Sequence, residues 1–399
     1  MNKLHQAVIL AAGESTRMHP LSITRPKALM KVANKTILEH LLTALKGLVE
    51  EVILVVGYKG KMIRDFFGIE FNNIKLSYVE QREQLGTGHA LLQAKGATSG
   101  RFIMMYGDDL VSGRDIKEAL KHKHAVLAKE VDDPERFGIF TLKGHMVKDI
   151  IEKPSNPESR LANTGVYVLD QGIFPLLERL EKSERGEYEI VDAIRLFASS
   201  NEVYCAMVSD YWLPIGYPWD LLDANSFLLE RMRGKLSGGV EKGAFLKGEV
   251  CVGKDSVVKS GAYIEGPVMI GEHCNIGPNC YIRAHTTIGN NCHVGNAVEV
   301  KNSILFDHTN VAHLSYVGDS VLGEHVNFGA GTIVANLRHD NNNVRSMVKG
   351  ILVDTGRRKL GTIVGDNVHT GIDTAIYPGR KIWPDKSTLP AEIVTKDKE

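Results

Sequence analysis

The sequence predicts an α/β protein of two domains, a Rossmann-like N-terminal domain with a mostly parallel sheet and then a left-handed parallel β-helix of hexapeptide repeats. Three observations lead to this fold class. The 399 residues exceed what a single hydrophobic core ordinarily organises. Up to about residue 220, apolar strand-like segments alternate with amphipathic helical ones, as in a parallel sheet covered by helices. From Val252 onward an aliphatic side chain returns every six residues, which is typical of a parallel β-helix.

The N-terminal elements follow a strand, helix, strand rhythm. Two amphipathic segments, Ile37–Leu48 and Gly88–Ala94, are predicted helices. The proline-rich run at residues 153–157 marks a loop. Short apolar runs are the predicted strands: Ala7–Ala11, Val52–Val56, Leu76–Val79, Phe102–Tyr106, Ala125–Lys129 and Gly165–Leu169.

A helix over Pro218–Arg233 and a hinge at residues 237–239 are predicted to join the two halves. We therefore expect domains at 1–225 and 246–399, with a linker helix and hinge at 226–245. The six-residue period slips near residues 302–305, leaves the coil in a polar, basic loop at 338–361, and returns at Val364. The aliphatic positions are Val252, Val258, Ile264, Ile270, Ile276, Ile282, Ile288, Val294 and Val300.

Composition excludes several classes of protein. The 48 basic and 48 acidic residues cancel, so no overall field attracts nucleic acid. The sequence has no apolar run of membrane-spanning length and no signal peptide at its start, so we expect a cytoplasmic protein. Five cysteines without a disulfide pattern agree with that setting. Cys274, Cys280 and Cys292 occupy the small-residue position of the repeat, which favours buried fillers over a metal site.

A glycine-containing turn follows the first strand. In Leu10-Ala11-Ala12-Gly13-Glu14-Ser15-Thr16-Arg17, backbone N–H groups and Arg17, with Lys27 close behind, can surround a polyphosphate. Taken alone, this segment equally fits an ordinary strand-to-helix turn. Two further motifs support the functional interpretation, Gln81-x-x-Gln84-Leu85-Gly86-Thr87-Gly88-His89-Ala90 and Tyr106-Gly107-Asp108-Asp109.

With these motifs, residues 5–225 resemble the sugar-1-phosphate nucleotidylyltransferases, and the second motif resembles those of bifunctional N-acetylglucosamine-1-phosphate uridyltransferases. The resemblance implies that Arg17 and Lys27 hold the triphosphate of UTP and that Asp108 binds Mg²⁺. It further implies nucleotide-binding roles for Ala11, Ala12, Gly13, Gln81, Gly86 and Thr87, and sugar-phosphate-binding roles for Gly138, Glu152, Lys153, Asn163 and Glu189.

The sequence departs from that family at the second metal position. Pro214 stands where relatives usually carry Asp or Asn, and proline has no side-chain ligand. Asp210 or Asp220 is one replacement. The interpretation we favour has Mg²⁺ held by Asp108, substrate phosphates and water, since Mg²⁺ commonly shares its oxygen ligands with phosphates.

A polar cluster interrupts the β-helix pattern between residues 294 and 336, and it resembles the acetyltransferase half of the same bifunctional enzymes. The resemblance implies that His313 is the general base, a task that suits imidazole because it ordinarily titrates near neutral pH. It implies that acetyl-CoA is the co-substrate and that the protein is a homotrimer or a dimer of trimers. It assigns the acetyl acceptor to Arg283, Lys301, Tyr316 and Asn327, and acetyl-CoA to Ala330 and Asn336.

The basic loop at 338–361 is longer than in bacterial relatives and resembles archaeal bifunctional ones. Its cations fit contacts with CoA phosphates and contacts within a trimer equally well. The expected function is therefore N-acetylation of glucosamine-1-phosphate followed by uridylyl transfer from UTP to the product. Two alternatives stay open, nucleotidyl transfer alone, from UTP or dTTP, with the β-helix as a trimerisation scaffold, and a non-catalytic regulatory subunit.

Overall fold

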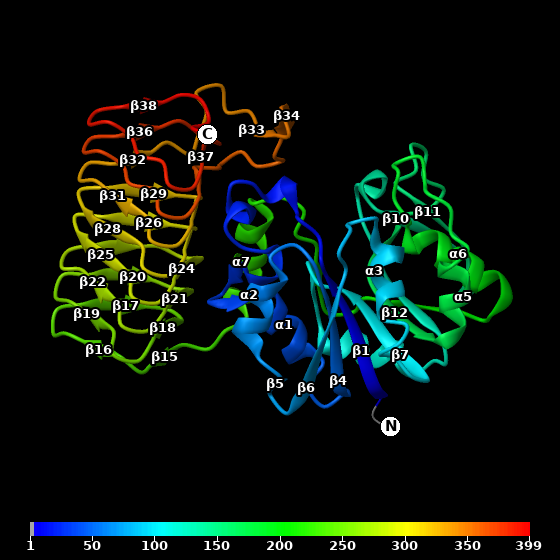
Figure 1. Ribbon diagram of the computed structural model, residues 1–399. Helices are drawn as coiled ribbons and strands as arrows, with labels where there is room; N and C mark the ends of the chain where they lie inside the picture. Colours follow the sequence, from blue (N-terminus) through cyan, green and yellow to red (C-terminus); the bar gives the residue numbers. More distant parts are fainter. Residues whose placement is uncertain (1–3) are drawn as a thin grey trace. The chain divides into compact units, whose positions relative to one another are not determined.

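The computed structural model describes residues 4–399, which divide into two compact units (Figure 1). The first, here called the sheet unit, comprises the chain up to Glu14, Pro26–Leu29 and Ile37–Pro214. The second, the β-helix unit, comprises Ser15–Arg25, Met30–Thr36 and Ile215–Glu399. Two short N-terminal segments thus group with the C-terminal half. The domain boundaries expected from the sequence stay predictions beside this division by contacts.

The sheet unit is built on a ten-stranded mixed sheet, and all six predicted strands are found in it. Its central strands are parallel, in the order β7-β1-β4-β6. The sequences of these strands are nearly continuous apolar runs, because both faces of the sheet are covered. The strands in sheet order are β10 (Gly138–Lys143), β11 (Met146–Glu152), β13 (Tyr204–Met207), β9 (Ala125–Glu130), β12 (Leu161–Asp170), β7 (Arg101–Tyr106), β1 (Leu4–Ala11), β4 (Val49–Val56), β6 (Ile74–Glu80) and β5 (Glu70–Phe71).

Helix α1 (Ile37–Ala44) ends four residues before the predicted Leu48, because the chain enters turns that include Gly47 at a φ of 77°. Two short strand pairs lie outside this sheet, β8 (Leu110–Val111) with β14 (Trp212–Leu213) in the sheet unit and β2 (Lys31–Val32) with β3 (Lys35–Thr36) in the β-helix unit. The remaining helices are α2 (Gly60–Phe67), α3 (Thr87–Gln93), α4 (Gly113–Ala119), α5 (Phe174–Leu177), α6 (Ile190–Ser200) and α7 (Asp220–Glu230). No helix among residues 4–399 is long and apolar enough to cross a membrane.

The parallel strands bring the predicted nucleotide-binding segments to one edge. Ala11 ends β1, Gln81 follows β6 and Asp108 follows β7, and these strands all run in the same direction. The β1 and β7 ends are tied by the Gly107 N–H, which donates to the Leu10 carbonyl at 2.9 Å. The carboxyl edge of such a sheet is where open α/β folds ordinarily bind ligands.

The C-terminal half is a parallel β-helix of three sheets, which confirms the predicted fold class (Figure 1). One sheet comprises β15 (Lys235–Leu236), β18 (Val250–Val252), β21 (Val268–Ile270), β24 (Thr286–Ile288), β27 (Ile304–Leu305), β30 (Val321–Leu322), β35 (Ile363–Val364) and β37 (Lys381–Ile382). The second comprises β16 (Gly239–Val240), β19 (Val257–Val258), β22 (Asn275–Ile276), β25 (His293–Asn296), β28 (Asn310–His313) and β31 (Asn327–Phe328). The third comprises β17 (Phe245–Lys247), β20 (Tyr263–Glu265), β23 (Tyr281–Ile282), β26 (Glu299–Lys301), β29 (Tyr316–Gly318), β32 (Ile333–Val334), β36 (Ala375–Ile376) and β38 (Ile393–Val394).

The coil register explains the slip in the sequence period. Ile270 pairs with Ile288, eighteen residues on, whereas Ile288 pairs with Leu305, only seventeen residues on. Leu305 pairs with Leu322, again seventeen residues on, so two successive coils are each one residue shorter, and the aliphatic side chains still stack in the buried core. Cys274, Cys280 and Cys292 lie in that core as unpaired thiols, as predicted for fillers.

Two local predictions differ from the structure. The predicted hinge at 237–239 lies within the first coil, since β15 and β16 already pair with β18 and β19. The predicted loop at 338–361 contains an antiparallel hairpin of β33 (Arg345–Val348) and β34 (Ile351–Asp354). The hairpin leaves the coil between β32 and β35 in the chain, and β35 still pairs with β30 of the preceding coil. A short alternating segment flanked by polar residues gives too little periodicity to predict such a hairpin.

Candidate active sites

The centre of the first candidate site is an ion pair in the sheet unit. Lys27 Nζ lies 2.9 Å from Asp108 Oδ2. The lysine side chain is buried, with 6% exposed, whereas the Asp108 side chain is 46% exposed. A buried ammonium beside a half-exposed carboxylate at the carboxyl edge of the sheet can bind an anion and a hard cation together.

The predicted nucleotide-binding residues Gln81, Gly86 and Thr87 lie at a tight turn around Gly86. This residue has a φ of 112°, and a Cβ atom there would lie 2.6 Å from the Tyr188 carbonyl oxygen. Gln81 Nε2 donates to the Gly86 carbonyl at 3.1 Å, and the Thr87 hydroxyl accepts from the Ile190 N–H at 3.0 Å. Three of the predicted nucleotide-binding residues are therefore brought together, in a turn that only glycine fits without strain.

The predicted sugar-phosphate residues gather where β10, β11 and β12 meet. Gly138 pairs with Glu152 in the antiparallel register, and a Cβ atom at Gly138 would lie 3.0 Å from Glu152 Oε2 and 3.5 Å from the Asn163 Cβ. Lys153 has a φ of 45°, a left-handed conformation that is sparsely populated outside glycine. A side chain at position 138 would therefore crowd Glu152 and Asn163.

Arg185 joins two of these carboxylates, although no sequence motif includes it. Its Nη1 lies 3.3 Å from Glu152 Oε1 and 3.2 Å from Glu189 Oε1. Burial raises the pKa of Glu189, the arginine opposes that shift, and the nearby Glu152 adds to it. Arg185 lies in a run of charged residues that looks like a solvated loop, so only the folded structure distinguishes it.

The structure bears on the missing second metal ligand at Pro214. Asp210 accepts a hydrogen bond from the Ser112 hydroxyl at 2.8 Å, within the sheet unit. Asp220, in the β-helix unit, accepts from the Gly216 and Tyr217 N–H groups at 2.7 and 2.8 Å. Both carboxylates have structural tasks, and the described residues 4–399 contain no group of three acidic, histidine or cysteine side chains arranged for a metal.

Arg17 groups with the β-helix unit rather than with Lys27. Its guanidinium lies over the Tyr217 ring, 5.6 Å from the centroid, and the side chain is exposed. Ser15, two residues before it, adopts a left-handed conformation with a φ of 54°, which glycine adopts more readily than serine.

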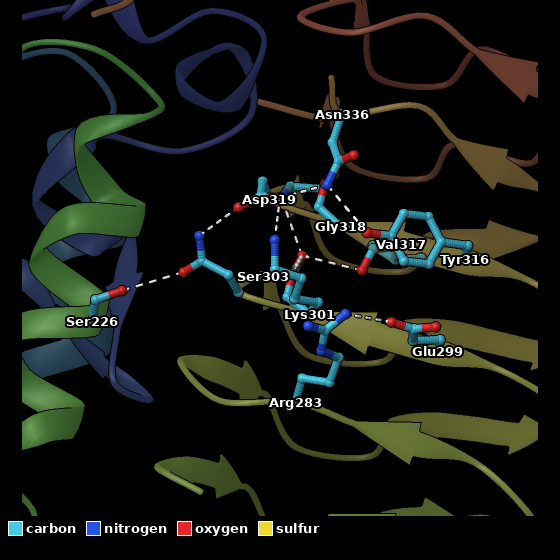
Figure 2. A network of polar contacts seen from close by, with 12 residues as sticks. Ser226, Arg283, Glu299, Lys301, Ser303, Tyr316, Val317, Gly318, Asp319 and Asn336 are labelled. Atoms are coloured by element: carbon cyan, nitrogen blue, oxygen red, sulfur yellow. Dashed lines mark hydrogen bonds and ion pairs between the residues drawn. The ribbon is translucent and has the colours of Figure 1, made fainter. Parts of the chain in front are cut away.

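The second candidate site lies on the β-helix (Figure 2). Arg283 Nη1 lies 2.9 Å from Glu299 Oε1, and this pairing raises the pKa of the guanidinium. Lys301 Nζ lies 3.1 Å from Asp319 Oδ2. The two cations predicted to grip the acetyl acceptor are thus both held by carboxylates from the following coil.

Asn336 completes this network. Its Nδ2 atom donates to the Tyr316 hydroxyl oxygen at 3.1 Å and to Asp319 Oδ2 at 2.5 Å, which uses both amide hydrogens. Gly318 leaves the space for these groups, since a Cβ atom there would lie 2.5 Å from the Tyr316 oxygen. Residues predicted for the acceptor and for acetyl-CoA therefore meet at one carboxylate, Asp319, for which the sequence suggested no role.

His313 and Asn327 lie on the neighbouring sheet, in β28 and β31, and outside this hydrogen-bond network. The His313 side chain is exposed, just before a corner of the coil at Leu314. It lies near His293, whose pKa is lowered by burial and then by the charges of Lys259 and His313. Ala330, predicted for acetyl-CoA, lies in the turn after β31. The predicted base thus shares a sheet with Asn327, whereas the other three predicted acceptor residues lie in or just after strands of another sheet.

A cavity of about 400 Å³ opens beside Lys301. The 338–361 segment contributes Arg357, which forms an ion pair with Asp223 of α7. The lining thus combines three cations with carboxylates, which is the composition expected for a small phosphorylated polar ligand. The lining residues are Asp223, Ser226, Glu265, Arg283, Ala284, His285, Lys301, Asn302, Asp319 and Arg357.

Family models match both halves of the chain. A model described as nucleotidyl transferase matches residues 6–231, and a model described as the GMPPB C-terminal domain matches residues 264–396. Among solved structures, a UDP-glucose pyrophosphorylase in complex with UDP-glucose matches with a TM-score of 0.53 and 22% identity, over 57% of this chain and 100% of the other. That likeness concerns the fold of the N-terminal half.

Curated relatives match nearly the whole chain. A bifunctional protein GlmU from Methanocaldococcus jannaschii is 42% identical over 377 residues, which cover 94% of this chain and 91% of the relative. A bifunctional sugar-1-phosphate nucleotidylyltransferase/acetyltransferase from Sulfurisphaera tokodaii is 39% identical, over 98% of each chain.

Proposed function

The chain belongs to the nucleotidyl transferase family and, over 94% of its length, to the family of bifunctional GlmU proteins, and from this premise we propose that it catalyses two successive steps of UDP-N-acetylglucosamine synthesis. The β-helix half transfers an acetyl group from acetyl-CoA to glucosamine-1-phosphate. The N-terminal half transfers uridylyl from UTP to the resulting N-acetylglucosamine-1-phosphate and releases pyrophosphate. The relative from Methanocaldococcus jannaschii is named as bifunctional, and that from Sulfurisphaera tokodaii is named for both nucleotidylyl transfer and acetyl transfer.

Uridylyl transfer needs no protein nucleophile, because the sugar phosphate is already ionised at neutral pH. Its oxygen attacks the α-phosphorus of UTP, and the bond to pyrophosphate breaks. Lys27 supplies positive charge for the phosphates, and the family resemblance adds Arg17. Ala11, Ala12, Gly13, Gln81, Gly86 and Thr87 would bind the nucleotide, while Gly138, Glu152, Lys153, Asn163 and Glu189 would orient the sugar phosphate.

Membership of this family implies a divalent metal, and the residues present fit Mg²⁺. Asp108 is a half-exposed carboxylate, which is the hard oxygen ligand that Mg²⁺ prefers. The bound metal would neutralise phosphate charge and orient the α-phosphorus. Since Asp210 and Asp220 are engaged elsewhere, Asp108 is the protein ligand that we propose, with phosphates and water completing the shell.

In acetyl transfer, the amine nitrogen of the acceptor attacks the thioester carbonyl carbon of acetyl-CoA and the CoA thiolate leaves. His313 would take the proton from the amine. Arg283, Lys301, Tyr316 and Asn327 would hold the acceptor, and Ala330 and Asn336 acetyl-CoA. Because His313 and Asn327 are on the sheet beside the acceptor network, we propose that neighbouring subunits of a homotrimer complete each site.

The polar network around Lys301 is the observation that supports an active β-helix rather than a scaffold. Burying an ion pair and an amide at a surface corner is costly unless the groups have partners, and trimerisation alone does not require them. Neither nucleotidyl transfer alone nor a regulatory subunit is favoured by relatives that are bifunctional over nearly the whole chain.

Two assays on one preparation test the proposal. Pyrophosphate release is measured with UTP and N-acetylglucosamine-1-phosphate, and thiol release with acetyl-CoA and glucosamine-1-phosphate, with dTTP and galactosamine-1-phosphate as comparison substrates. Both releases are expected. If a preparation of trimeric size releases pyrophosphate but no thiol, the β-helix serves only as a trimerisation scaffold.

A further inference from the structure

Asp319 occupies the middle coil of three that carry the acetyltransferase network. Lys301, Asp319 and Asn336 come just at or after the ends of β26, β29 and β32, which are consecutive strands of one sheet. The carboxylate therefore receives the ammonium from the coil on one side and the amide from the coil on the other (Figure 2).

The carboxylate is buried and its oxygens are fully engaged. Its side chain is 4% exposed. Oδ2 accepts from Lys301 Nζ at 3.1 Å and from Asn336 Nδ2 at 2.5 Å, and Oδ1 accepts from Asn302 Nδ2 at 2.7 Å. A buried charge persists only with such partners, so removal of the charge disturbs three donors at once.

The backbone of Asp319 is fixed independently of its side chain. The residue has a φ of 52° at a corner of the coil, its N–H donates to the Lys301 carbonyl at 2.9 Å, and its carbonyl accepts from the Gly361 N–H at 2.9 Å. Aspartate and asparagine both tolerate this left-handed conformation. Asp319→Asn therefore removes the charge and reduces the number of hydrogen bonds that the side chain can accept, while the backbone conformation at this corner of the coil is retained.

From this geometry we propose that Asp319 is a positioning residue for acetyl transfer, which holds the acceptor-binding Lys301 and the acetyl-CoA-binding Asn336 in fixed relation to each other. The inference rests on the acetyltransferase function proposed above. Asp319 lies at the edge of the cavity, but its side chain is only 4% exposed and both of its oxygens are engaged by Lys301, Asn302 and Asn336, so it acts through these partners. The bond to Asp319 uses one of the three hydrogens of the Lys301 ammonium and leaves two for a phosphate in the adjoining cavity.

The hydrogen-bond network around Asp319 extends to helix α7. Asn302, which donates to Asp319, accepts a hydrogen bond from the Ser226 hydroxyl at 3.2 Å. Asparagine at position 319 offers one oxygen to three donors, and its own amide hydrogens then face an ammonium or an amide. Lys301 and Asn336 lose their common acceptor, and we expect both substrates to be misplaced.

The test compares steady-state acetyl transfer by wild type and Asp319→Asn, with each substrate varied in turn. We expect kcat/KM to fall roughly tenfold to a hundredfold for both glucosamine-1-phosphate and acetyl-CoA. Pyrophosphate release by the same preparation should stay within about twofold of wild type, which shows that the variant is folded. In the Lys301→Met variant, the additional Asp319→Asn substitution should lower kcat/KM by less than about threefold. The effects are not additive, because Lys301 and Asp319 act as a unit.

Asp385→Asn is the matched control. Asp385 is also a corner aspartate with a positive φ, of 62°, and it accepts from the Asn367 side chain of the preceding coil at 2.9 Å, but it is exposed and outside the network. This control should keep acetyl transfer within about twofold. An Asp319→Asn enzyme that equals wild type, or that loses both activities in equal measure, would overturn the positioning role. Wild type without any thiol release would sink the acetyltransferase proposal as well.

Discussion

Lys27 Nζ and Asp108 Oδ2 lie 2.9 Å apart although 81 residues separate them in the chain. Lys27 comes after β1 and Asp108 after β7, and these strands are parallel neighbours in the sheet. The cation that we propose for the phosphates and the carboxylate that we propose for the metal are thus adjacent in the fold. Such preorganisation avoids reorganisation of charge during the reaction.

Lys27→Met is expected to lower kcat/KM for pyrophosphate release by about 10²–10³-fold, because it removes charge stabilisation at the phosphates. Thiol release from acetyl-CoA should not change. Lys95→Met is the control, since Lys95 pairs with Glu178 at the surface of the same unit. Equal effects of the two substitutions, or retention of pyrophosphate release by Lys27→Met, would contradict the role given to Lys27.

Gly86→Ala should impair nucleotide binding specifically. The added Cβ atom would lie 2.6 Å from the Tyr188 carbonyl oxygen at a φ of 112°, and the strain is about 1–3 kcal/mol. We expect KM for UTP to rise while acetyl transfer continues. Gly96→Ala, where a Cβ atom would have no neighbour within 4 Å, is the control. If UTP binds equally well to both variants, the Gly86 turn is not part of the base site.

Arg357→Gln tests a third role for the basic segment, contact with the sugar phosphate, against contact with CoA phosphates. Arg357 lines the cavity with Arg283 and Lys301, so we expect KM for glucosamine-1-phosphate to rise about tenfold, from the loss of a charged hydrogen bond. KM for acetyl-CoA should stay constant. The neighbouring Arg358, which is exposed and donates to Asn341, gives the control Arg358→Gln. A rise in KM for acetyl-CoA instead would favour contacts with CoA phosphates.

The buried Lys381 predicts a pH-dependent stability. It is 1% exposed, its Nζ donates to the Met347 carbonyl at 2.7 Å, and burial lowers its pKa from 10.5 to about 8. Between these two pH values the unfolded chain binds the extra proton, so the free energy of unfolding rises with pH across this window. The full effect is at most about 3 kcal/mol.

Denaturant unfolding of wild type and Lys381→Met at pH 7 to 10 checks this directly. Other titrating groups are common to both proteins and cancel in the difference. Wild type should gain stability relative to the variant above pH 8. Curves that stay parallel over the whole range would show that Lys381 is ionised alike in the folded and unfolded chains.

Much of the fold follows from periodicity. The six-residue aliphatic pattern predicts the β-helix, and even its slip near residues 302–305 corresponds to a coil one residue shorter. Apolar runs predict the parallel strands because both faces of that sheet are buried. The β33–β34 hairpin could not be predicted, since its strands are short and half exposed.

Part of each candidate site could likewise be predicted from the sequence, and part could not. Motif residues such as Lys27 and Asp108 are adjacent in the structure, as two groups that serve one phosphate should be. Asp319 could not be recognised, because aspartate also occupies the exposed corners at Asp255, Asp373 and Asp385. Which corner is buried depends on the side chains of neighbouring coils. Those side chains are distant in the sequence, and the hairpin inserts further residues between them.

Formation of UDP-N-acetylglucosamine from glucosamine-1-phosphate, acetyl-CoA and UTP by wild type, His313→Ala and Asp108→Asn tests the bifunctional account most directly. Wild type should make the nucleotide sugar from all three substrates. His313→Ala should make it only when N-acetylglucosamine-1-phosphate is supplied, and Asp108→Asn should accumulate that intermediate. A His313→Ala enzyme that still converts glucosamine-1-phosphate, or a wild type that cannot, would contradict two active sites in one chain.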